Sequence, residues 1–361
     1  MVKGKRKFWY LLGFLIFAFY MLIAARPIPK ETILKPRWIT SLESNYPDRG
    51  KPEFAESTES LPFRLGERYG FVGDDGKFVI NQIREAYISL SEKYWAEYDA
   101  YPSSIRVMNH LNENVLTIDN PAGYPLFLDD RIFLIGSEQN SITAIGEDGT
   151  ELWTHDFPAP ITCIDASGGF VLAGTLDGAV ELLNSSGRAV FSPFEPGGSR
   201  LAVILGCAIS HDASRLAIIS GIDKQRFLLM ERAGDTYKVT YHEFLSEGYR
   251  RPVNIRFVGN DGKVTFEREG GLGIYDIGSR TSYRVNLEGE IASIDNNGGD
   301  RYLFVVTSQG ALEKCLITIR YPAFIVSKAP FRSDQVFFTR RGTKLYLGGD
   351  SAMASFELEK K

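Results

Sequence analysis

Four histidines and three cysteines are the side chains of this sequence best suited to bind a metal ion or transfer protons. The histidines are His110, His155, His211 and His242. Cys207 and His211 lie four residues apart, but His211 falls in an expected turn. No other histidine lies two or four residues from a histidine or a cysteine, the spacing that places two ligands on one side of a strand or helix. The sequence therefore predicts no local metal site, no catalytic residue and no bound cofactor, although a site assembled from distant segments stays open.

Cys163, Cys207 and Cys315 fall on segments that are typical of strands, and an odd number of cysteines cannot pair completely within one chain. Two alternatives remain. Cys163 and Cys207 occupy equivalent places in neighbouring repeats, so a bridge between them is conceivable in an oxidising compartment. We favour three buried thiols, because an unpaired cysteine behaves as a small apolar side chain.

The densest aromatic segment carries Tyr94, Trp95, Tyr98 and Tyr101. Tryptophan and tyrosine are favoured anchors of protein interfaces, so these four residues are our candidates for a partner-binding surface. The alternative is structural. Tyr94, Ala96 and Tyr98 alternate along one expected strand and would share one face that packs inside the fold.

These side chains belong to a sequence pattern that recurs seven times: a short apolar strand, a turn of Asp, Asn, Ser or Gly, and a stronger apolar strand. The first strands of the seven copies are Tyr69–Val72, Leu126–Leu128, Ile161–Ile164, Cys207–Ile209, Val253–Val258, Ile291–Ile294 and Val336–Phe338. The spacing of roughly 44 residues lies in the range of propeller blades. The sequence thus predicts an all-β fold, a seven-bladed β-propeller.

The third copy shows the later strands of a blade most clearly, with Phe170–Ala173, Val180–Leu183 and Ala189–Phe191. Asp177-Gly178 and Ser186-Gly187 supply the positive φ angles that tight hairpins need. A single sheet of this kind cannot bury both faces, so we expect the blades to stack radially around a centre.

The chain ends soon after Ala354–Leu358, which is the third strand of its blade, so we expect Leu61–Leu65 to complete the seventh blade. The first copy is longer than the others, which leaves six or eight blades as alternatives. Its additional strands are Ala86–Leu90, Tyr94–Tyr98, Ile105–Met108 and Val115–Ile118.

The N-terminal region predicts a membrane anchor. Lys3, Lys5, Arg6 and Lys7 precede the uncharged run Phe8–Ala25, which is long enough as a helix to cover roughly the hydrocarbon thickness of a bilayer. The expected domains are a cytoplasmic tail at 1–7, a transmembrane signal-anchor helix at 8–25, a Pro-rich linker at 26–60 and the propeller at 61–361. A cleaved signal peptide is the alternative.

The linker carries apolar residues that would be poorly placed in water, so part of it is alternatively expected to pack on the propeller. These residues are Trp38, Ile39, Leu42, Tyr46 and Phe54. The net charge of −4 is small and evenly spread, so we expect no nucleic acid among the partners.

Two segments resemble known propeller families. Residues 210–217 (SHDASRLA) resemble the S-P-D-G-x-x-L-A turn of WD40-like and TolB-like blades, with His211 in place of the usual proline. Residues 147–153 (EDGTELW) resemble the D-G-x-x-x-W segment of quinoprotein-like (PQQ-like, YVTN-type) repeats, including periplasmic assembly-factor propellers. Only Trp153 stands at the tryptophan docking position and no adjacent cysteine pair is present, so pyrroloquinoline quinone is not expected.

The expected protein is a membrane-tethered β-propeller that acts as a protein-binding or assembly scaffold in the cell envelope. We expect a single-pass topology with the N-terminus in the cytoplasm, the propeller in the periplasm or outside the cell, and an unidentified protein as its partner. The alternatives are a propeller enzyme, such as a quinoprotein-like oxidoreductase acting at the channel mouth, and a structural subunit of an envelope complex. The fold itself implies no reaction, and enzyme activity stays uncertain.

Overall fold

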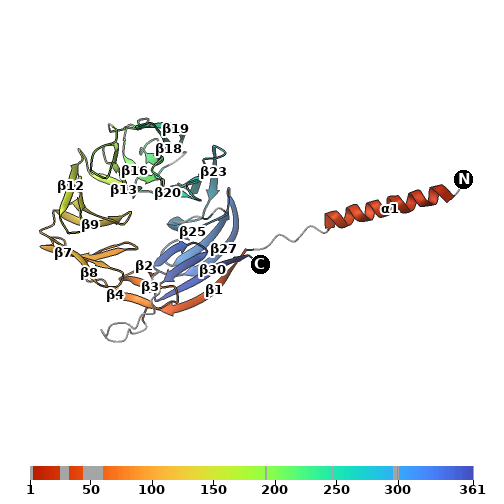
Figure 1. Cartoon of the computed structure of the whole chain (residues 1–361), viewed down its shortest axis with the longest axis horizontal. Helices are drawn as coiled ribbons and strands as arrows, with labels where there is room; N and C mark the ends of the chain where they lie inside the picture. Colours follow the sequence, from red (N-terminus) through yellow and green to blue (C-terminus); the bar gives the residue numbers. More distant parts are fainter. Residues whose placement is uncertain are drawn as a thin grey trace.

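The computed structural model describes residues 3–24, 32–43, 60–191, 193–245, 248–295, 299 and 301–360. In these ranges the chain forms one helix and thirty strands, and the strands form eight antiparallel sheets. The sheets are arranged around a ring (Figure 1). We number the sheets as blades 1 to 8 in chain order.

Blade 1 consists of β2 (Ser60–Leu65), β3 (Arg68–Gly73) and β4 (Phe78–Ile83). Blade 2 consists of β5 (Tyr87–Leu90), β6 (Tyr94–Tyr98), β7 (Ser104–Asn109) and β8 (Asn114–Asp119). Blade 3 consists of β9 (Gly123–Leu128), β10 (Arg131–Gly136), β11 (Ser141–Ile145) and β12 (Glu151–Asp156). Blade 4 consists of β13 (Ile161–Ser167), β14 (Phe170–Thr175) and β15 (Val180–Leu183).

Blade 5 consists of β16 (Ile204–Ile209), β17 (Arg215–Ser220), β18 (Arg226–Ala233) and β19 (Thr236–Phe244). Blade 6 consists of β20 (Ile255–Val258), β21 (Lys263–Arg268), β22 (Gly271–Asp276) and β23 (Thr281–Asn286). Blade 7 consists of β24 (Glu290–Ile294), β25 (Tyr302–Ser308), β26 (Glu313–Arg320) and β27 (Phe324–Arg332). Blade 8 consists of β28 (Val336–Arg341), β29 (Lys344–Gly349), β30 (Ala352–Lys360) and β1 (Thr32–Ser41).

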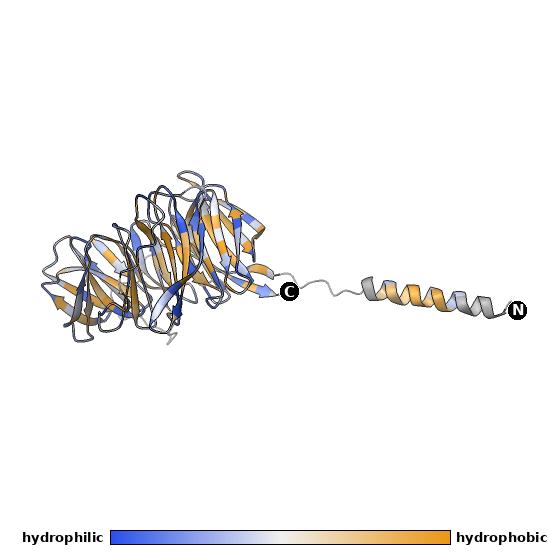
Figure 2. Cartoon of the chain, turned by 90° about the horizontal axis from the view of Figure 1, so that it is seen from above, coloured by the Kyte–Doolittle hydropathy of each residue, from blue (hydrophilic) through white to orange (hydrophobic). Residues whose placement is uncertain are grey.

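The hydrophobic core is divided among the contacts between blades. Within the described residues there are eight clusters of buried apolar side chains, and each joins two neighbouring sheets. Between blades 5 and 6, for example, Phe227 stacks on Phe266 with ring centroids 4.4 Å apart. The apolar residues therefore lie within and between the sheets, which Figure 2 shows in orange. Because every blade needs a neighbour on both faces, the ring has to close.

Blade 1 runs in the opposite direction to its neighbour blade 8. Arg341, at the end of β28, donates to the carbonyl of Ser60, where β2 begins (3.4 Å). At the other end, a Cβ atom on Gly66, just after β2, would lie 3.5 Å from the side chain of Gln335, just before β28. β2 is thus antiparallel to β28. Blade 1 has three strands, so its last strand ends at the same end of the ring as its first strand. This brings the chain to the end of the ring where β5 begins.

The prediction of seven blades is wrong, because the long first copy contains two sheets. Its later strands are not an added hairpin: they form the whole of blade 2. The turn between β5 and β6 contains Ser91, Glu92 and Lys93 and has no glycine or aspartate. Ser91 closes this turn instead, since its hydroxyl accepts the N–H of Tyr94 (3.0 Å). The repeat signal is therefore weak at this blade.

The prediction that Leu61–Leu65 completes the last blade is also wrong. Leu61–Leu65 belongs to β2, which pairs only with β3, and the outer strand of the last blade is β1. β1 pairs antiparallel with β30, and Lys35 and Arg37 form ion pairs of 2.9 Å with Glu359 and Glu357 across the two strands. Sequence analysis had placed these residues in the linker, where charged positions alternate with apolar ones as on a half-buried outer strand.

The alternative that linker residues pack on the propeller is confirmed for Trp38 and Leu42. The Trp38 indole N–H donates to the carbonyl of Asp74 in blade 1 (2.8 Å), and Leu42 is buried between blades 8 and 1. Ile39 remains exposed. Tyr46 and Phe54 lie outside the described residues. The N-terminal strand β1 and the C-terminal strand β30 are therefore held in one sheet by noncovalent contacts.

The helix α1 (Lys3–Ala24) corrects the prediction of a transmembrane helix at 8–25. In the part of the chain that the structure describes, no helix combines the length and the apolar character that crossing a membrane requires. The helix begins at Lys3, within the cationic segment. The predicted single-pass anchor is therefore not supported.

Candidate functional site

Two groups of residues are candidates for a functional site. One lies where the first strands of the blades end, and the other lies where these strands begin. The turns that follow β13, β16 and β20 lie together, because Ser167, His211 and Asp261 in these turns bond to one another. We call this end of the ring the first-turn face. We call the other end, where β5 and β9 begin, the entry face.

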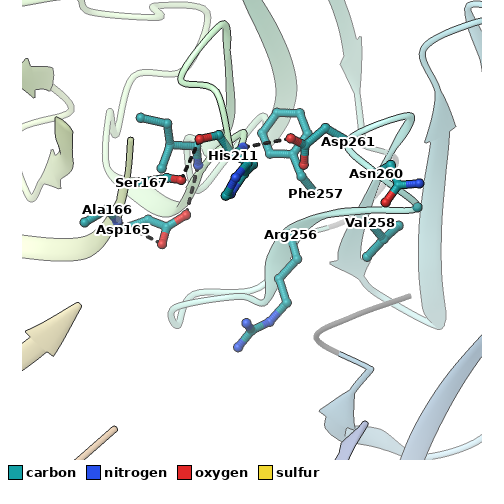
Figure 3. A pocket seen from close by; sticks show the side chains of 11 residues that line it. Asp165, Ala166, Ser167, His211, Arg256, Phe257, Val258, Asn260 and Asp261 are labelled. Carbon is teal, nitrogen blue, oxygen red and sulfur yellow. Dashed lines mark hydrogen bonds between the residues drawn. The ribbon is translucent and has the colours of Figure 1, made fainter. Parts of the chain in front are cut away.

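Hydrogen bonds between side chains and backbone tie the turns of blades 4, 5 and 6 together at the first-turn face (Figure 3). The Ser167 hydroxyl donates to the carbonyl of His211 (3.0 Å), and the N–H of His211 donates to Asp261 Oδ2 (2.7 Å). The N–H of Ile209 donates to Asp165 Oδ2 (2.9 Å). These bonds hold three consecutive turns in one arrangement.

The same pattern extends to blade 3. The Arg131 guanidinium donates to the carbonyls of Gly169 (3.1 Å) and Phe170 (2.8 Å) in the turn of blade 4. Asp129 lies beside Arg131, with 3.5 Å between Oδ2 and Nη2. The polar turn residues of this repeat therefore work mainly as connectors between blades.

A pocket of about 530 Å³ opens among the tied turns. Its lining includes Asp165, Ser167, His211, Arg256 and Asp261. Arg256 lies on β20, and in Figure 3 its side chain extends away from the hydrogen-bonded turns. Its guanidinium forms no hydrogen bond or ion pair with any residue that the structure describes. The pocket thus contains one uncommitted cation.

Asp165 is an acid of this pocket with a displaced pKa. Burial raises the pKa of its carboxyl group. The N–H groups of Ile209 and Ala166 and the nearby Arg256 charge oppose that rise without cancelling it. The carboxyl group is therefore held between two backbone donors at the edge of the pocket and serves first as a connector of blades 4 and 5.

The other histidines lie apart from this pocket. His155 on β12 contacts Glu181 of blade 4 (3.1 Å) and packs edge-on against Phe157, His110 lies near Phe71, and His242 lies near Phe244. Among the described residues, no group of three or more His, Cys, Asp or Glu side chains is placed to hold a metal ion.

The three cysteines are free thiols, of which Cys207 is buried and Cys163 and Cys315 are partly buried. Cys207 and Cys163 lie on neighbouring first strands, β16 and β13. A hydrogen bond with Cys163 and burial together raise the pKa of the Cys207 thiol well above its ordinary value. No bridge joins the two strands in this structure.

The structure separates the four predicted partner-binding residues into two pairs. Tyr94 and Trp95 are only 8% and 6% exposed and lie in the contacts of blade 2 with blades 3 and 1. Tyr98 is half-buried, and Tyr101, in the loop after β6, is 93% exposed. Successive residues of a strand point to opposite sides, so Tyr94 and Trp95 enter different cores.

Two further tyrosines lie near Tyr98 and Tyr101 at the entry face. Tyr87, at the start of β5, stacks on Tyr98 with ring centroids 5.8 Å apart, and Tyr124, near the start of β9, lies 5.9 Å from Tyr98. The Tyr124 hydroxyl donates to the carbonyl of Ala100, beside Tyr101 (3.3 Å). We call Tyr87, Tyr98, Tyr101 and Tyr124 the tyrosine surface.

Sequence analysis missed Tyr87, Tyr124, Asp165 and Arg256. The tyrosines had a signal, because each stands at the first or second position of an inner strand. Arg256 had none, since its importance depends on which turns lie beside it in space.

The ring of eight antiparallel sheets, closed by an N-terminal strand in the last sheet, defines this protein as a β-propeller. Comparison with known families agrees: residues 1–361 match the family described as beta-propeller protein, and the chain belongs to this family. The chain is also similar to an uncharacterized protein of Treponema pallidum (strain Nichols). The two are 26% identical over 364 residues, which cover 99% of this chain and 95% of that protein.

Three solved structures share the fold. BamB from Moraxella catarrhalis has a TM-score of 0.59 and 11% identity, covering 90% of this chain and 100% of that chain. The computationally designed protein Ika8 has a TM-score of 0.59 and 12% identity, covering 84% and 98%. Apo AztD from Citrobacter koseri has a TM-score of 0.58 and 11% identity, covering 80% and 88%. At these identities the likeness concerns the fold alone.

Proposed function

We propose that this propeller is a protein-binding scaffold and that its partner docks on the tyrosine surface. The observation that carries the proposal is the exposure of aromatic side chains at one place on the entry face. Tyr87 is 58% exposed and stacks on the half-buried Tyr98, which lies against the half-buried Tyr124. Tyr101 is 93% exposed and follows Ala100, whose carbonyl accepts the Tyr124 hydroxyl. Tyrosine is enriched at the centres of protein interfaces, where its ring supplies contact area and its hydroxyl a hydrogen bond.

The tyrosine surface is already ordered before a partner arrives. Tyr87, Tyr98 and Tyr124 lie on strands β5, β6 and β9 and contact one another through their rings. Immobilising a flexible side chain on binding costs about 0.5–1.5 kcal/mol, and rings held in place by their neighbours avoid much of that cost. A partner would therefore meet a rigid aromatic patch that spans blades 2 and 3.

A site-specific crosslinking experiment tests this proposal. A photo-reactive amino acid replaces Tyr101 in the full chain. The matched control carries it at Phe324, another exposed aromatic position (58%) on the outer strand of blade 7. We expect a discrete crosslinked protein from position 101 in intact cells, and none from position 324. Identical products from both positions, or none from position 101, would contradict the proposal.

Substitution then asks whether the captured protein depends on the surface. Tyr87→Ala and Tyr124→Ala should each weaken its binding by about tenfold or more, because interface tyrosines commonly contribute at least 1–2 kcal/mol. Phe324→Ala should leave binding unchanged. Equal binding by all three variants would assign the contact to another part of the propeller.

We propose also that the propeller works outside the cytoplasm. Support comes from the order of the first residues, in which the cationic Lys5, Arg6 and Lys7 precede an apolar run from Phe8, an order typical of export signals. A C-terminal alkaline phosphatase fusion of the full chain should be active, and reversing the three charges should reduce that activity. An inactive fusion that accumulates in the cytoplasm would contradict export.

A further inference from the structure

We propose that the pocket at the first-turn face binds a carboxylate group of an extended peptide, and that Arg256 receives this carboxylate. The pocket lies at the opposite end of the inner strands from the tyrosine surface, so the proposal goes beyond the docking function and does not depend on it. The ligand it implies is a segment with one acidic residue among neutral polar or basic ones.

The distribution of hydrogen bonds in the pocket points to an anionic group. Asp165 accepts backbone N–H groups on both of its oxygens, and Asp261 accepts the N–H of His211. The Arg256 guanidinium, in contrast, has no such partner among the residues that the structure describes. A guanidinium group offers five donors in a planar fork that matches a carboxylate, and such charge-assisted bonds are about twice as strong as neutral ones.

The size and rigidity of the pocket favour a peptide over a free ion. Its volume of about 530 Å³ lies within the range of sites that enclose whole ligands and far exceeds the space of a single carboxylate. The exposed His211 imidazole and Asn260 amide and the half-buried Phe257 ring add polar and apolar contacts beside Arg256. The bonds among the turns of blades 4, 5 and 6 fix these groups before binding, which lowers the entropic cost.

The charges of the pocket also limit the sequence of the peptide. Asp165 and Asp261 lie in the same lining as Arg256, so a second or third acidic residue would meet like charge. Neutral or basic residues beside the acidic one would not be repelled. The pocket therefore selects a single carboxylate in a polar or basic context and disfavours a polyacidic segment.

The test uses the purified full chain and two fluorescein-labelled hexapeptide pools. The first pool has one fixed Glu flanked by Ser, Asn or Lys, and the second is identical except that Gln replaces the Glu. We expect fluorescence anisotropy to show binding of the Glu pool that is at least about tenfold tighter than binding of the Gln pool. Equal binding of the two pools would overturn the proposal.

Variants of the chain assign the site. Arg256→Gln should weaken binding of the Glu pool to the level of the Gln pool, and Arg256→Lys should retain part of it, because a lysine keeps the charge but loses the planar fork. Arg84→Gln is the matched control, since Arg84 is an exposed arginine near the start of β5 at the entry face. Unchanged binding by Arg256→Gln, or an equal loss in Arg84→Gln, would overturn the assignment.

Inorganic phosphate and acetate distinguish a peptide from a free oxyanion. We expect either ion to compete with the Glu pool only at concentrations far above those of the peptide, because neither fills the remainder of the pocket. Competition at concentrations similar to the peptide would mean that the pocket binds small oxyanions, which would overturn the proposed peptide ligand.

Discussion

The two ends of the inner strands use their side chains in opposite ways. At the first-turn face, Asp165, Ser167 and Asp261 bond to the backbone of a neighbouring blade, so these polar groups hold the turns together. At the entry face, Tyr87 and Tyr98 contact each other through their rings and leave much of their area in solvent. One end is ordered by directional hydrogen bonds and the other by aromatic stacking.

This difference indicates which residues of the ring can be substituted without loss of stability. A turn whose polar side chain holds the neighbouring blade cannot change without loosening that blade, whereas an exposed ring at a strand start contributes little to the core. The pocket is thus built from structurally required residues around one free arginine. The tyrosine surface is built around the exposed Tyr87 and Tyr101, although Tyr98 also packs against the core between blades 2 and 3. Substitutions at the two ends should therefore separate stability from binding.

The largest effect is expected within the aromatic segment itself, where buried and exposed side chains lie six residues apart. Trp95→Ala should lower the free energy of unfolding by about 3–5 kcal/mol, because it removes a large buried side chain at the contact of blades 1 and 2. It also leaves the carbonyl of Asn109 without the indole donor (3.0 Å). Chemical denaturation of the full chain measures the change.

Tyr101→Ala is the matched control for Trp95→Ala. Because Tyr101 is 93% exposed, its removal should change the free energy of unfolding by no more than about 0.5 kcal/mol. A loss of stability in Tyr101→Ala comparable to that in Trp95→Ala would break the distinction between the structural and the exposed half of the segment.

A smaller loss is expected at the first-turn face from Asp165→Ala. This substitution leaves the N–H groups of Ile209 and Ala166 without their acceptor, and a buried unsatisfied donor costs about 1–3 kcal/mol. Hydrogen exchange should show faster exchange at Ile209, at the end of β16, with no change at β5 or β6. Equal acceleration at both ends of the ring would mean that the two regions are not independent.

Ser167→Ala should have a weaker effect on the same face. It removes one hydroxyl that donates to the carbonyl of His211, at a half-exposed position where water can replace it. The expected loss is about 0.5–1 kcal/mol in the free energy of unfolding. Ser167→Thr keeps the hydroxyl and should restore most of the loss; a threonine variant as unstable as the alanine variant would show that the bond contributes nothing.

The class of fold can be predicted from the sequence because apolar strands and turn residues recur in seven of the eight blades. Blade 2 was not predicted as a separate blade, because Ser91 closes its first turn with a hydroxyl and the turn lacks the glycine or aspartate that marks the other copies. The strand that closes the ring was not predicted, because β1 lies far from β30 in sequence and pairs with it only once the ring has formed. Strand pairing of this kind is a property of the closed ring and leaves no local pattern.

Residues of the candidate sites could be predicted only where the local sequence around them is distinctive. Tyr98 and Tyr101 were identified by aromatic density, and the alternative that Tyr94, Ala96 and Tyr98 share an inward face is confirmed at the contact of blades 2 and 3. The burial of Trp95 depends on the opposite face of blade 2 meeting blade 1. Arg256 is a single arginine in a strand, and His211 contacts Asp261 from 50 residues away. Only the packing of three blades brings these groups to one pocket.

The smallest expected effect concerns two aspartates of blades 4 and 5 whose pKa values are displaced in opposite directions. Burial raises the pKa of Asp165 above 3.8, whereas bonds from the Ser214 hydroxyl, the Ser214 N–H and the Ser210 hydroxyl lower the pKa of Asp212 to about 2. The folded state therefore binds a proton on Asp165 more tightly than the unfolded chain does, and on Asp212 less tightly. Asp165 contributes stability below its ordinary pKa and loses it as the pH rises through the raised value; Asp212 contributes stability above its ordinary pKa and loses it as the pH falls toward 2.

Asp165→Asn and Asp212→Asn convert this contrast into a measurement. Urea unfolding between about pH 2 and pH 7 gives the free energy of each variant relative to the parent chain. As the pH rises, the parent should lose stability relative to Asp165→Asn and gain stability relative to Asp212→Asn, so the two difference curves slope in opposite directions. Phe324→Ala, which removes no ionisable group, should give a flat difference. A flat difference for Asp165→Asn would mean that Asp165 is solvated like an ordinary surface aspartate, and the first-turn face would then resemble the open surface at the other end of the ring. A slope of the same sign as that of Asp212→Asn would mean that the pKa of Asp165 is lowered and would contradict the prediction.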